Sequence, residues 1–256
     1  MERQEELMIQ KRLLDLSRMA DRKGITTFSN FLNLNELNLF HQVSADMQTS
    51  YQLSGGYEFA ERQMIAFIPD ALYYSDKQPE PEFPIAVLRF FPLHMKFAED
   101  LSHRDVLGAL MHLGVERSRI GDIKIEGQNY IIFCEEGIAE YLLDSLGQIR
   151  HTMITGERAV SGSYQIEQKF EQIEGIIASN RLDSIVAFLT GKSRSQSVRM
   201  IQSQKVFVNE AVRLENAFEC REGDIISIRG FGKYIYKGSG GETKKGRLKI
   251  QLKKYV

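Results

Sequence analysis

This sequence contains few of the residues on which covalent cross-links and metal sites depend. Its two cysteines, Cys134 and Cys220, lie far apart, and Cys134 sits in an apolar run. We therefore expect core thiols of a reducing cytosol and no disulfide. The five histidines have no metal-ligand spacing with each other or with the cysteines. The sequence predicts no metal site.

Long hydrophobic stretches are also missing. The longest apolar run, Phe83 to Leu93, is interrupted by Arg89 and is too short to cross a bilayer. The N-terminus, MERQEELMIQKRLLDL, is charged and amphipathic, which is not the pattern of a signal peptide. We expect a soluble, cytoplasmic protein without a membrane segment. At 256 residues and 43% hydrophobic, the chain has room for two or three small domains.

Complete catalytic motifs are absent as well. The HRD at 103–105 copies the kinase catalytic triplet, but Leu110 stands where that motif needs Asn. The GKS at 191–193 copies the end of a P-loop, but Val186 stands where that motif needs Gly. No nucleophile has a recognisable partner. We therefore predict no catalytic residue and no cofactor.

The net charge of −1 hides a strong asymmetry along the chain. Residues 181–256 hold 16 Lys and Arg against 7 Asp and Glu, whereas residues 1–180 hold 17 against 27. The C-terminal part therefore carries +9 and the remainder −10. A basic segment of this kind suggests a polyanionic partner, although charge alone also fits a solvated basic surface.

Residues 81–156 show strand and helix signals in the order β-α-β-β-α-β. The pattern places strands at 85–91, 123–126, 130–134 and 149–154, and helices at 102–113 and 136–146. This order is that of a ferredoxin-like domain, which many RNA-recognition modules share. The aromatic signature used for base stacking is missing from 130–134, which argues against stacking on this sheet. Upstream, we predict helices at 3–22 and 57–63 and a strand at 64–68.

The most informative stretch lies between residues 181 and 233. Two helical patterns, 182–190 and 194–203, are joined by a Gly-Lys turn. Ser193 stands at the N-cap of the second helix with Gln196 three residues later, the spacing of a capping box. Strands at 206–208 and 226–229 follow, separated by a Glu-Gly-Asp turn. A capped helix start among basic side chains is well suited to phosphate.

These motifs carry a family resemblance. RLD at 181–183, SR opening a helix, then VxVN, EGD and IxIR resemble an S4 RNA-binding domain over roughly 178–233. The whole chain resembles the YlmH family of bacterial S4-domain proteins through HRDVLGALMHLGVERSRIGDI at 103–123 and RGFGKY at 229–234. Gln204 and Glu210 depart from the S4 pattern, because glycine is common at both positions, and the local backbone geometry stays open there.

We predict an α+β fold in which an N-terminal α/β body, including a ferredoxin-like (RRM-like) domain, precedes a C-terminal S4 domain. The S4 domain should place two helices on a small antiparallel sheet. The expected boundaries are an N-terminal helical and mixed subdomain at 1–80, the ferredoxin-like domain at 81–156, a connection at 157–177 and the S4 domain at 178–256. The Gly-rich basic loop at 238–246 could clamp RNA or be a solvated hairpin tip.

The predicted RNA-binding residues are cations and hydroxyls around the helix pair. They are Arg181, Lys192, Ser193, Arg194, Ser195, Arg199, Lys205, Arg229 and Lys233. The alternative for each arginine is a surface salt bridge worth ~0–1 kcal/mol. Asp183 should pair with Arg194 or Arg181 and orient it, and Asn209 should be a turn residue. In the middle domain, Arg104, Arg117 and Arg119 could hold a helix to a loop or contact RNA.

The YlmH resemblance implies a non-enzymatic protein that associates with the large ribosomal subunit and contacts its ribosomal RNA and tRNA. It also implies a part in handling stalled peptidyl-tRNA in ribosome quality control; we expect a monomer. The residues alone predict only structured-RNA binding through a basic helix pair. One alternative is an RNA-modifying enzyme in which the S4 domain delivers a catalytic body to its target. RLD at 181–183 is similar to a triplet of pseudouridine synthases, but the S4 context explains it better. Another is a cell-division adaptor whose acidic body binds a protein partner, because genes of this family lie near cell-division genes.

Overall fold

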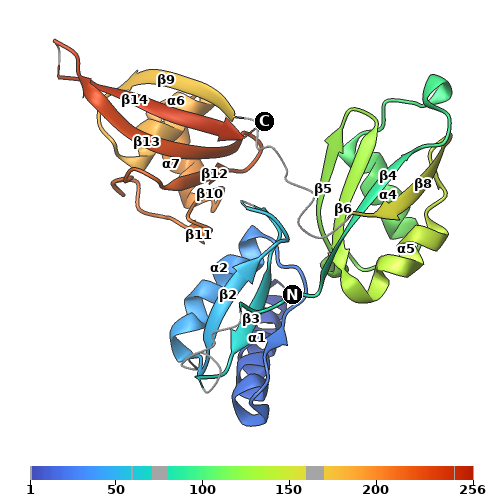
Figure 1. Cartoon of the computed structure of the whole chain (residues 1–256). Coiled ribbons are helices and arrows are strands. Elements are labelled where there is room, and N and C mark those ends of the chain that lie inside the picture. The colour runs from blue at the N-terminus through green and yellow to red at the C-terminus, as the bar shows by residue number, and fades with distance from the viewer. Residues whose placement is uncertain (1, 59, 71–79, 160–169, 245, 256) are drawn as a thin grey trace. The chain divides into compact units, whose positions relative to one another are not determined.

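The structure is a computed structural model that describes residues 2–58, 60–70, 80–159, 170–244 and 246–255 (Figure 1). They belong to two compact units, Met1–Ile166 and Glu167–Val256, named unit 1 and unit 2 below. Unit 1 is built around two hydrophobic clusters and unit 2 around one. Residues 1–80 and 81–156 therefore lie in one compact unit, and the boundary expected between them stays a prediction.

The first part of unit 1 packs helices against a small antiparallel sheet of strand order β1-β3-β2. Its elements are α1 (Glu2–Lys23), β1 (Thr27–Phe28), α2 (Leu34–Val43), the 3-10 helix η1 (Ser44–Asp46), β2 (Ser50–Ser54) and β3 (Met64–Ile68). The helix predicted at 3–22 and the strand predicted at 64–68 are confirmed by α1 and β3. Leu13, Phe40 and Phe67 form the centre of this core.

No helix forms over the described residues of the segment 57–63, where one was predicted. The backbone N–H groups of Glu61 and Arg62 donate to the Asp122 carboxylate at 2.7 and 3.1 Å. The Tyr57 hydroxyl donates to the same carboxylate at 2.5 Å. The prediction was wrong because a side chain 61 positions after Glu61 binds these N–H groups, and tertiary contacts of this kind override local propensity.

The second part of unit 1 is a five-stranded antiparallel sheet of order β5-β6-β4-β8-β7. Its elements are β4 (Ile85–Pro92), η2 (Met95–Phe97), α4 (His103–His112), η3 (Arg117–Arg119), β5 (Ile120–Glu126), β6 (Asn129–Glu135), η4 (Glu136–Ile138), α5 (Ala139–Ser145), β7 (Gln148–Ile149) and β8 (Thr152–Arg158). The predicted ferredoxin-like order is confirmed. The strand expected at 149–154 is instead a hairpin of β7 and β8 that turns at Arg150, with φ 51°.

Helices α4 and α5 cover one face of this sheet, and Tyr57 from the first part of unit 1 packs against the other face. Ile132 and Cys134 of β6 pack in the core under α4 and α5, so Phe133 between them points to the opposite face. There its ring lies 4.8 Å from the ring of Tyr57, and it is buried. Phe133 is therefore not open to a base, in agreement with the missing stacking signature.

Unit 2 is a six-stranded antiparallel sheet of order β11-β10-β12-β13-β14-β9 with two helices on one face (Figure 1). Its elements are β9 (Phe170–Ile177), α6 (Leu182–Thr190), α7 (Arg194–Gln202), β10 (Val206–Val208), β11 (Ala211–Val212), β12 (Ile225–Ile228), β13 (Gly232–Glu242) and β14 (Leu248–Tyr255). Ile185 and Ile201 from the helices share a core with Ile250 and Leu252 of β14. The predicted helix pair on an antiparallel sheet is confirmed.

Strand β9 corrects the expectation of a connection at 157–177. It pairs with β14 along its full length, from Ile177 opposite Leu248 to Phe170 opposite Tyr255. Strand β8 also extends through Arg158. The expected loop at 238–246 begins later than predicted, because β13 continues through Glu242 with two register shifts on the way. Part of the expected connection, 160–169, lies outside the described residues.

Candidate RNA-binding surface

The first turn of α6 is closed by a neighbouring loop. Arg181 occupies the N-cap position. The backbone N–H groups of Leu182 and Asp183 donate to the carbonyl groups of Phe218 and Asn216 at 2.8 and 3.2 Å. These N–H groups are therefore used within the protein. The helix end open to an anion in this pair is that of α7.

The start of α7 has the predicted geometry. Gly191, with φ 65°, ends α6 in the left-handed conformation that glycine favours. The Ser193 hydroxyl accepts the N–H of Gln196 at 3.3 Å, and the N–H of Ser193 donates to the Gln196 side chain at 3.1 Å. The capping box is confirmed. The first N–H groups of an α-helix have no partner within the helix and carry its positive dipole end, so they attract phosphate.

A buried carboxylate holds two guanidinium groups beside this helix start. Asp183 is 2% exposed. It accepts from Nε and Nη2 of Arg181 at 3.3 and 3.2 Å and from Nε of Arg194 at 3.0 Å. The Arg181 and Arg194 side chains remain 38% and 56% exposed. Asp183 was expected to pair with one arginine or the other, and the structure shows that it pairs with both.

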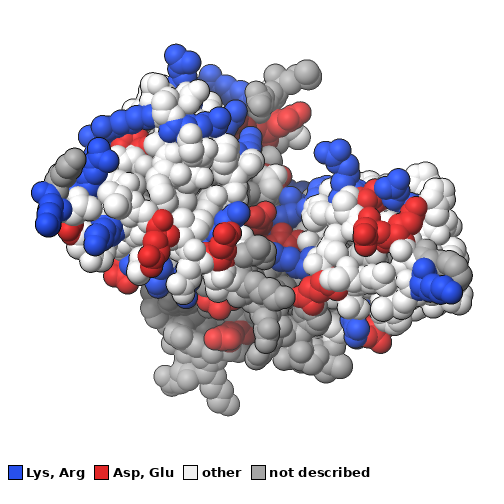
Figure 2. Space-filling model, turned by 90° about the horizontal axis from the view of Figure 1, so that it is seen from above, with Lys and Arg blue, Asp and Glu red and all other residues white. Residues whose placement is uncertain are grey.

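The other predicted cations, apart from Lys233, are exposed around the helix pair. Lys192 places its ammonium 5.8 Å from the centre of the Phe231 ring. Lys205 and Arg229 are neighbours, because the N–H of Arg229 donates to the carbonyl of Lys205 at 2.9 Å. Arg199 and Ser195 are exposed on α7. Figure 2 shows basic side chains along the rim of unit 2, on its left.

Lys233 lies apart from the other predicted cations. It is only 5% exposed, and its ammonium lies 5.5 Å from the centre of the Tyr255 ring. It stands opposite Ser227 in the pairing of β12 and β13, on the face turned away from the S4 core. We therefore leave Lys233 out of the surface formed by the helix pair. Phe231, which was not among the predicted RNA-binding residues, joins that surface as the ring beneath Lys192.

Two family models match the sequence. The model described as "Putative RNA-binding domain in YlmH" matches residues 80–160, and the S4 domain model matches residues 180–226. The chain carries a YlmH RNA-binding domain followed by an S4 domain. The resemblance seen in the RLD-to-IxIR motifs and in the stretch 103–123 is confirmed, and RNA binding is the function that the two domains share.

The similarity extends along almost the whole chain. The protein named "Ribosome-associated protein quality control protein P2" from Bacillus subtilis (strain 168) is 26% identical over 242 residues, which are 94% of this chain and 92% of that protein. Among solved structures, "Cell division protein ylmH from Streptococcus pneumoniae" is 19% identical with a TM-score of 0.48, covering 61% of this chain and 92% of that chain.

The backbone is left-handed at the two positions where the sequence departs from the glycine-containing S4 pattern. Gln204 and Glu210 have φ values of 57° and 67°, in the left-handed region. Asn209, with φ 51°, and Glu210 form the two-residue turn between β10 and β11, a turn for which Asn-Gly is the favoured sequence. The Asn209 side chain also binds Asp224 and the N–H of Ile225, both at 2.9 Å. Its predicted turn role is confirmed.

The YlmH domain uses its central arginines to hold its own backbone. Arg117 donates to the carbonyl groups of Ile120 and Gly121 at 2.6 and 3.0 Å, and burial lowers its pKa to about 10. Arg119 pairs with Glu135 at 2.5 Å. For Arg117 and Arg119, these contacts support a structural role rather than contact with RNA. Arg104 is exposed.

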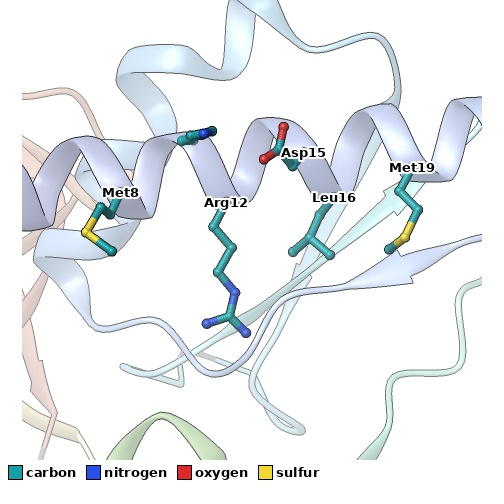
Figure 3. Close-up of a pocket in the computed structure, with 6 residues that line it drawn as sticks. Met8, Arg12, Asp15, Leu16 and Met19 are labelled. Carbon is teal, nitrogen blue, oxygen red and sulfur yellow. The ribbon is translucent and has the colours of Figure 1, made fainter.

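Unit 1 also has a shallow hollow of about 400 Å³ along α1 (Figure 3). Met8, Arg12, Leu16 and Met19 point to the same side of the helix, and Met8 is 71% exposed. Lys11 and Asp15 complete the lining of this hollow. Among the described residues, no group of His, Cys, Asp and Glu could hold a metal ion, and no helix has the length and apolarity to span a membrane.

Proposed function

We propose that this chain is a non-enzymatic, ribosome-associated protein that binds large-subunit ribosomal RNA and tRNA through its S4 helix pair. The name of the Bacillus subtilis relative supports a ribosomal role in protein quality control. In the cytoplasm, such a protein would take part in the handling of stalled peptidyl-tRNA. The basic charge of residues 181–256 fits a polyanionic partner.

The observation that carries this proposal is the buried Asp183 with its two arginines. A guanidinium has five N–H donors, and Asp183 engages two from Arg181 and one from Arg194. The remaining donors are available to phosphate oxygens. Because both side chains are already ordered, binding avoids an entropy loss of about 0.5–1.5 kcal/mol for each.

The neighbouring groups favour the same ligand. Lys192 lies in the turn before α7, and Ser195 lies in its first helical turn, where the free N–H groups are. The helix dipole and the cations attract an anion at the same place. Arg199, Lys205 and Arg229 extend the positive charge, which suits the backbone of a folded RNA.

Sedimentation of cell lysate through sucrose gradients tests the ribosomal assignment. We compare wild type with Arg181→Ala/Arg194→Ala and with the control Arg18→Ala/Arg22→Ala, which removes two exposed charges from α1. Wild type and the control should travel with large subunits, and the first variant should stay at the top. If wild type stays at the top, the ribosomal proposal fails.

Sequencing of RNA cross-linked to the protein in each fraction tests the ligand. We expect enrichment of large-subunit ribosomal RNA and tRNA in wild type and loss of both in Arg181→Ala/Arg194→Ala. A protein partner for the acidic unit 1 remains a second prediction. If Arg181→Ala/Arg194→Ala still travels with large subunits but carries no cross-linked RNA, attachment through a protein partner of unit 1 is favoured over attachment through the S4 surface.

A further inference from the structure

The sheet of unit 2 has a second face, which the helix pair does not use. Side chains alternate across a strand, and Ile250 and Leu252 of β14 point into the core under the helices. Gln251, Lys253 and Tyr255 therefore point to the opposite face. The pairing of β14 with β9 sets them beside Glu174, Gln172 and Phe170. We name these six side chains the sheet-face array.

One end of the sheet-face array combines aromatic rings with cations. The rings of Phe170 and Tyr255 are 5.1 Å apart and inclined by 61°. The ammonium of Lys253 lies 5.4 Å from the centre of the Phe170 ring, and that of Lys233 lies 5.5 Å from the centre of the Tyr255 ring. The burial of Lys233 thus has an explanation, because the Lys233 side chain packs against the Tyr255 ring on this face of the sheet.

The other end of the array is hollowed and polar. The hollow measures about 220 Å³, well above the volume of about 30 Å³ that a water molecule takes in the liquid. Its polar lining residues are Gln172, Glu174, Glu222, Lys237, Gln251 and Lys253. The Gln251 amide donates to Glu174 at 3.1 Å. Amide and carboxylate groups of this kind bind the edges of nucleic-acid bases.

We infer that the sheet-face array binds a short single-stranded segment of RNA. Phe170 and Tyr255 provide the rings for base stacking, Lys253 and Lys237 the charges for phosphates, and the hollow the hydrogen bonds for a base edge. Unpaired bases are required, because a duplex hides the base faces that stacking needs. This site uses residues outside the proposed S4 surface, so the two can fail separately.

The ring contacts do not prevent a base from entering. Stacking of a base on an aromatic side chain contributes more binding free energy than an exposed contact between a cation and a ring. A base can therefore replace the Lys253 ammonium above Phe170. The displaced ammonium then lies close enough to pair with the phosphate of the same nucleotide.

Fluorescence anisotropy on the full-length protein tests the inference. The probe is a short fluorescein-labelled single-stranded RNA that cannot pair with itself. Phe170→Leu should weaken binding about tenfold, as expected for the loss of one stacked base. Lys253→Gln should weaken it several-fold. The control is Lys254→Gln, which makes the same charge change at the next residue. The alternation of side chains places Lys254 on the other face of the sheet, where it pairs with Glu171. It should change the affinity less than twofold.

Photo-cross-linking of wild type to the same RNA carrying 4-thiouridine gives a readout that does not depend on a variant folding. Cross-links should map to 170–177 or 248–255 and persist in Arg181→Ala/Arg194→Ala. The inference is overturned if cross-links map only to α6 and α7, or if folded Phe170→Leu binds as tightly as Lys254→Gln. Such a result with intact co-sedimentation leaves the proposed function standing.

Discussion

At the residue scale, Asp183 separates two explanations of RNA binding by the S4 surface. If positive charge alone attracts RNA, removing this carboxylate strengthens binding. If the carboxylate orients Arg181 and Arg194, removing it weakens binding. The short contacts to both arginines favour orientation.

Asp183→Asn should therefore weaken RNA binding about tenfold, since two side chains lose their order and each such loss costs about 0.5–1.5 kcal/mol. The control is Glu215→Gln, which makes the same charge change at an exposed residue of unit 2. Binding of a large-subunit ribosomal RNA fragment to each protein is measured by filter retention. Tighter binding by Asp183→Asn would show that charge alone decides.

Glu210→Gly should stabilise unit 2. A side chain in the left-handed region costs roughly 1–2 kcal/mol, part of which glycine loses again as unfolded-state entropy. The net gain should be about 0.5–1 kcal/mol and raise Tm by several degrees in a unit of this size. Ala211→Gly, one residue later in β11, should lower Tm. Calorimetry on the full chain measures both, and equal shifts would contradict the backbone explanation.

Residue roles could be predicted where a local motif determines them. The Ser193 capping box and the pairing of Asp183 each depend on neighbours within eleven positions. The burial of Lys233 could not be predicted, because motif order gives its strand but not the side of the sheet on which its side chain lies. The backbone at Gln204 and Glu210 could not be predicted, since neither side chain by itself favours the left-handed conformation.

At the scale of elements, the loop between β2 and β3 and the strand β5 hold the parts of unit 1 together. The Asp122 carboxylate on β5 binds Tyr57, Glu61 and Arg62 of that loop. The sequence showed Asp122 only as the end of a family-like stretch. Its partners lie about sixty positions away, beyond the range of a local pattern. For the same reason β9, whose partner is β14, was predicted as a connection.

Tyr57→Phe should destabilise unit 1 by about 1–2 kcal/mol at neutral pH, because a buried carboxylate loses one of its donors. Burial and the nearby Asp122 raise the pKa of the Tyr57 hydroxyl, so wild type keeps this hydroxyl neutral throughout the neutral range. Tyr51→Phe, at a more exposed tyrosine in β2, should change stability little. Urea unfolding followed by circular dichroism compares the two variants. Equal losses of unfolding free energy would contradict a stabilising role of the Tyr57 hydroxyl.

The buried thiol of Cys134 in β6 predicts a loss of stability in alkali. Burial raises its pKa from 9.0 to about 12. The stabilising contribution is complete below pH 9 and is lost as the pH rises towards 12. At pH 10 the loss relative to pH 7 should be about 1.4 kcal/mol. Cys134→Ala should show a correspondingly smaller drop in unfolding free energy between these pH values, and an identical drop would contradict this assignment.

At the scale of the whole molecule, charge is divided between an acidic N-terminal part and a basic C-terminal part. Composition alone predicted this division and the class of partner that it favours. It could not predict that the basic charge of unit 2 lies on both the helix pair and the opposite sheet face. That arrangement follows from strand pairing between residues far apart in the chain.

The salt dependence of RNA binding should report the contacts of the S4 surface. Each phosphate contact contributes about 0.7–0.9 to the slope of log affinity against log salt. Arg181→Ala/Arg194→Ala should therefore reduce the slope by about 1.4–1.8, whereas Arg18→Ala/Arg22→Ala should leave it unchanged. Anisotropy titrations over a range of KCl concentrations measure the slopes. Equal slopes in the two double variants would assign the phosphate contacts to other residues.

The position of β14 between β13 and β9 has a consequence for the order in which the chain folds during its synthesis. The helix pair depends on local contacts and can form early, but β9 must wait until 248–255 have been made before it acquires its partner. Until then the growing chain exposes an unpaired strand, which is a site for mispairing. Completion of the sheet of unit 2 therefore requires synthesis through residue 255, and the sheet that supports both proposed RNA-binding surfaces is incomplete until then.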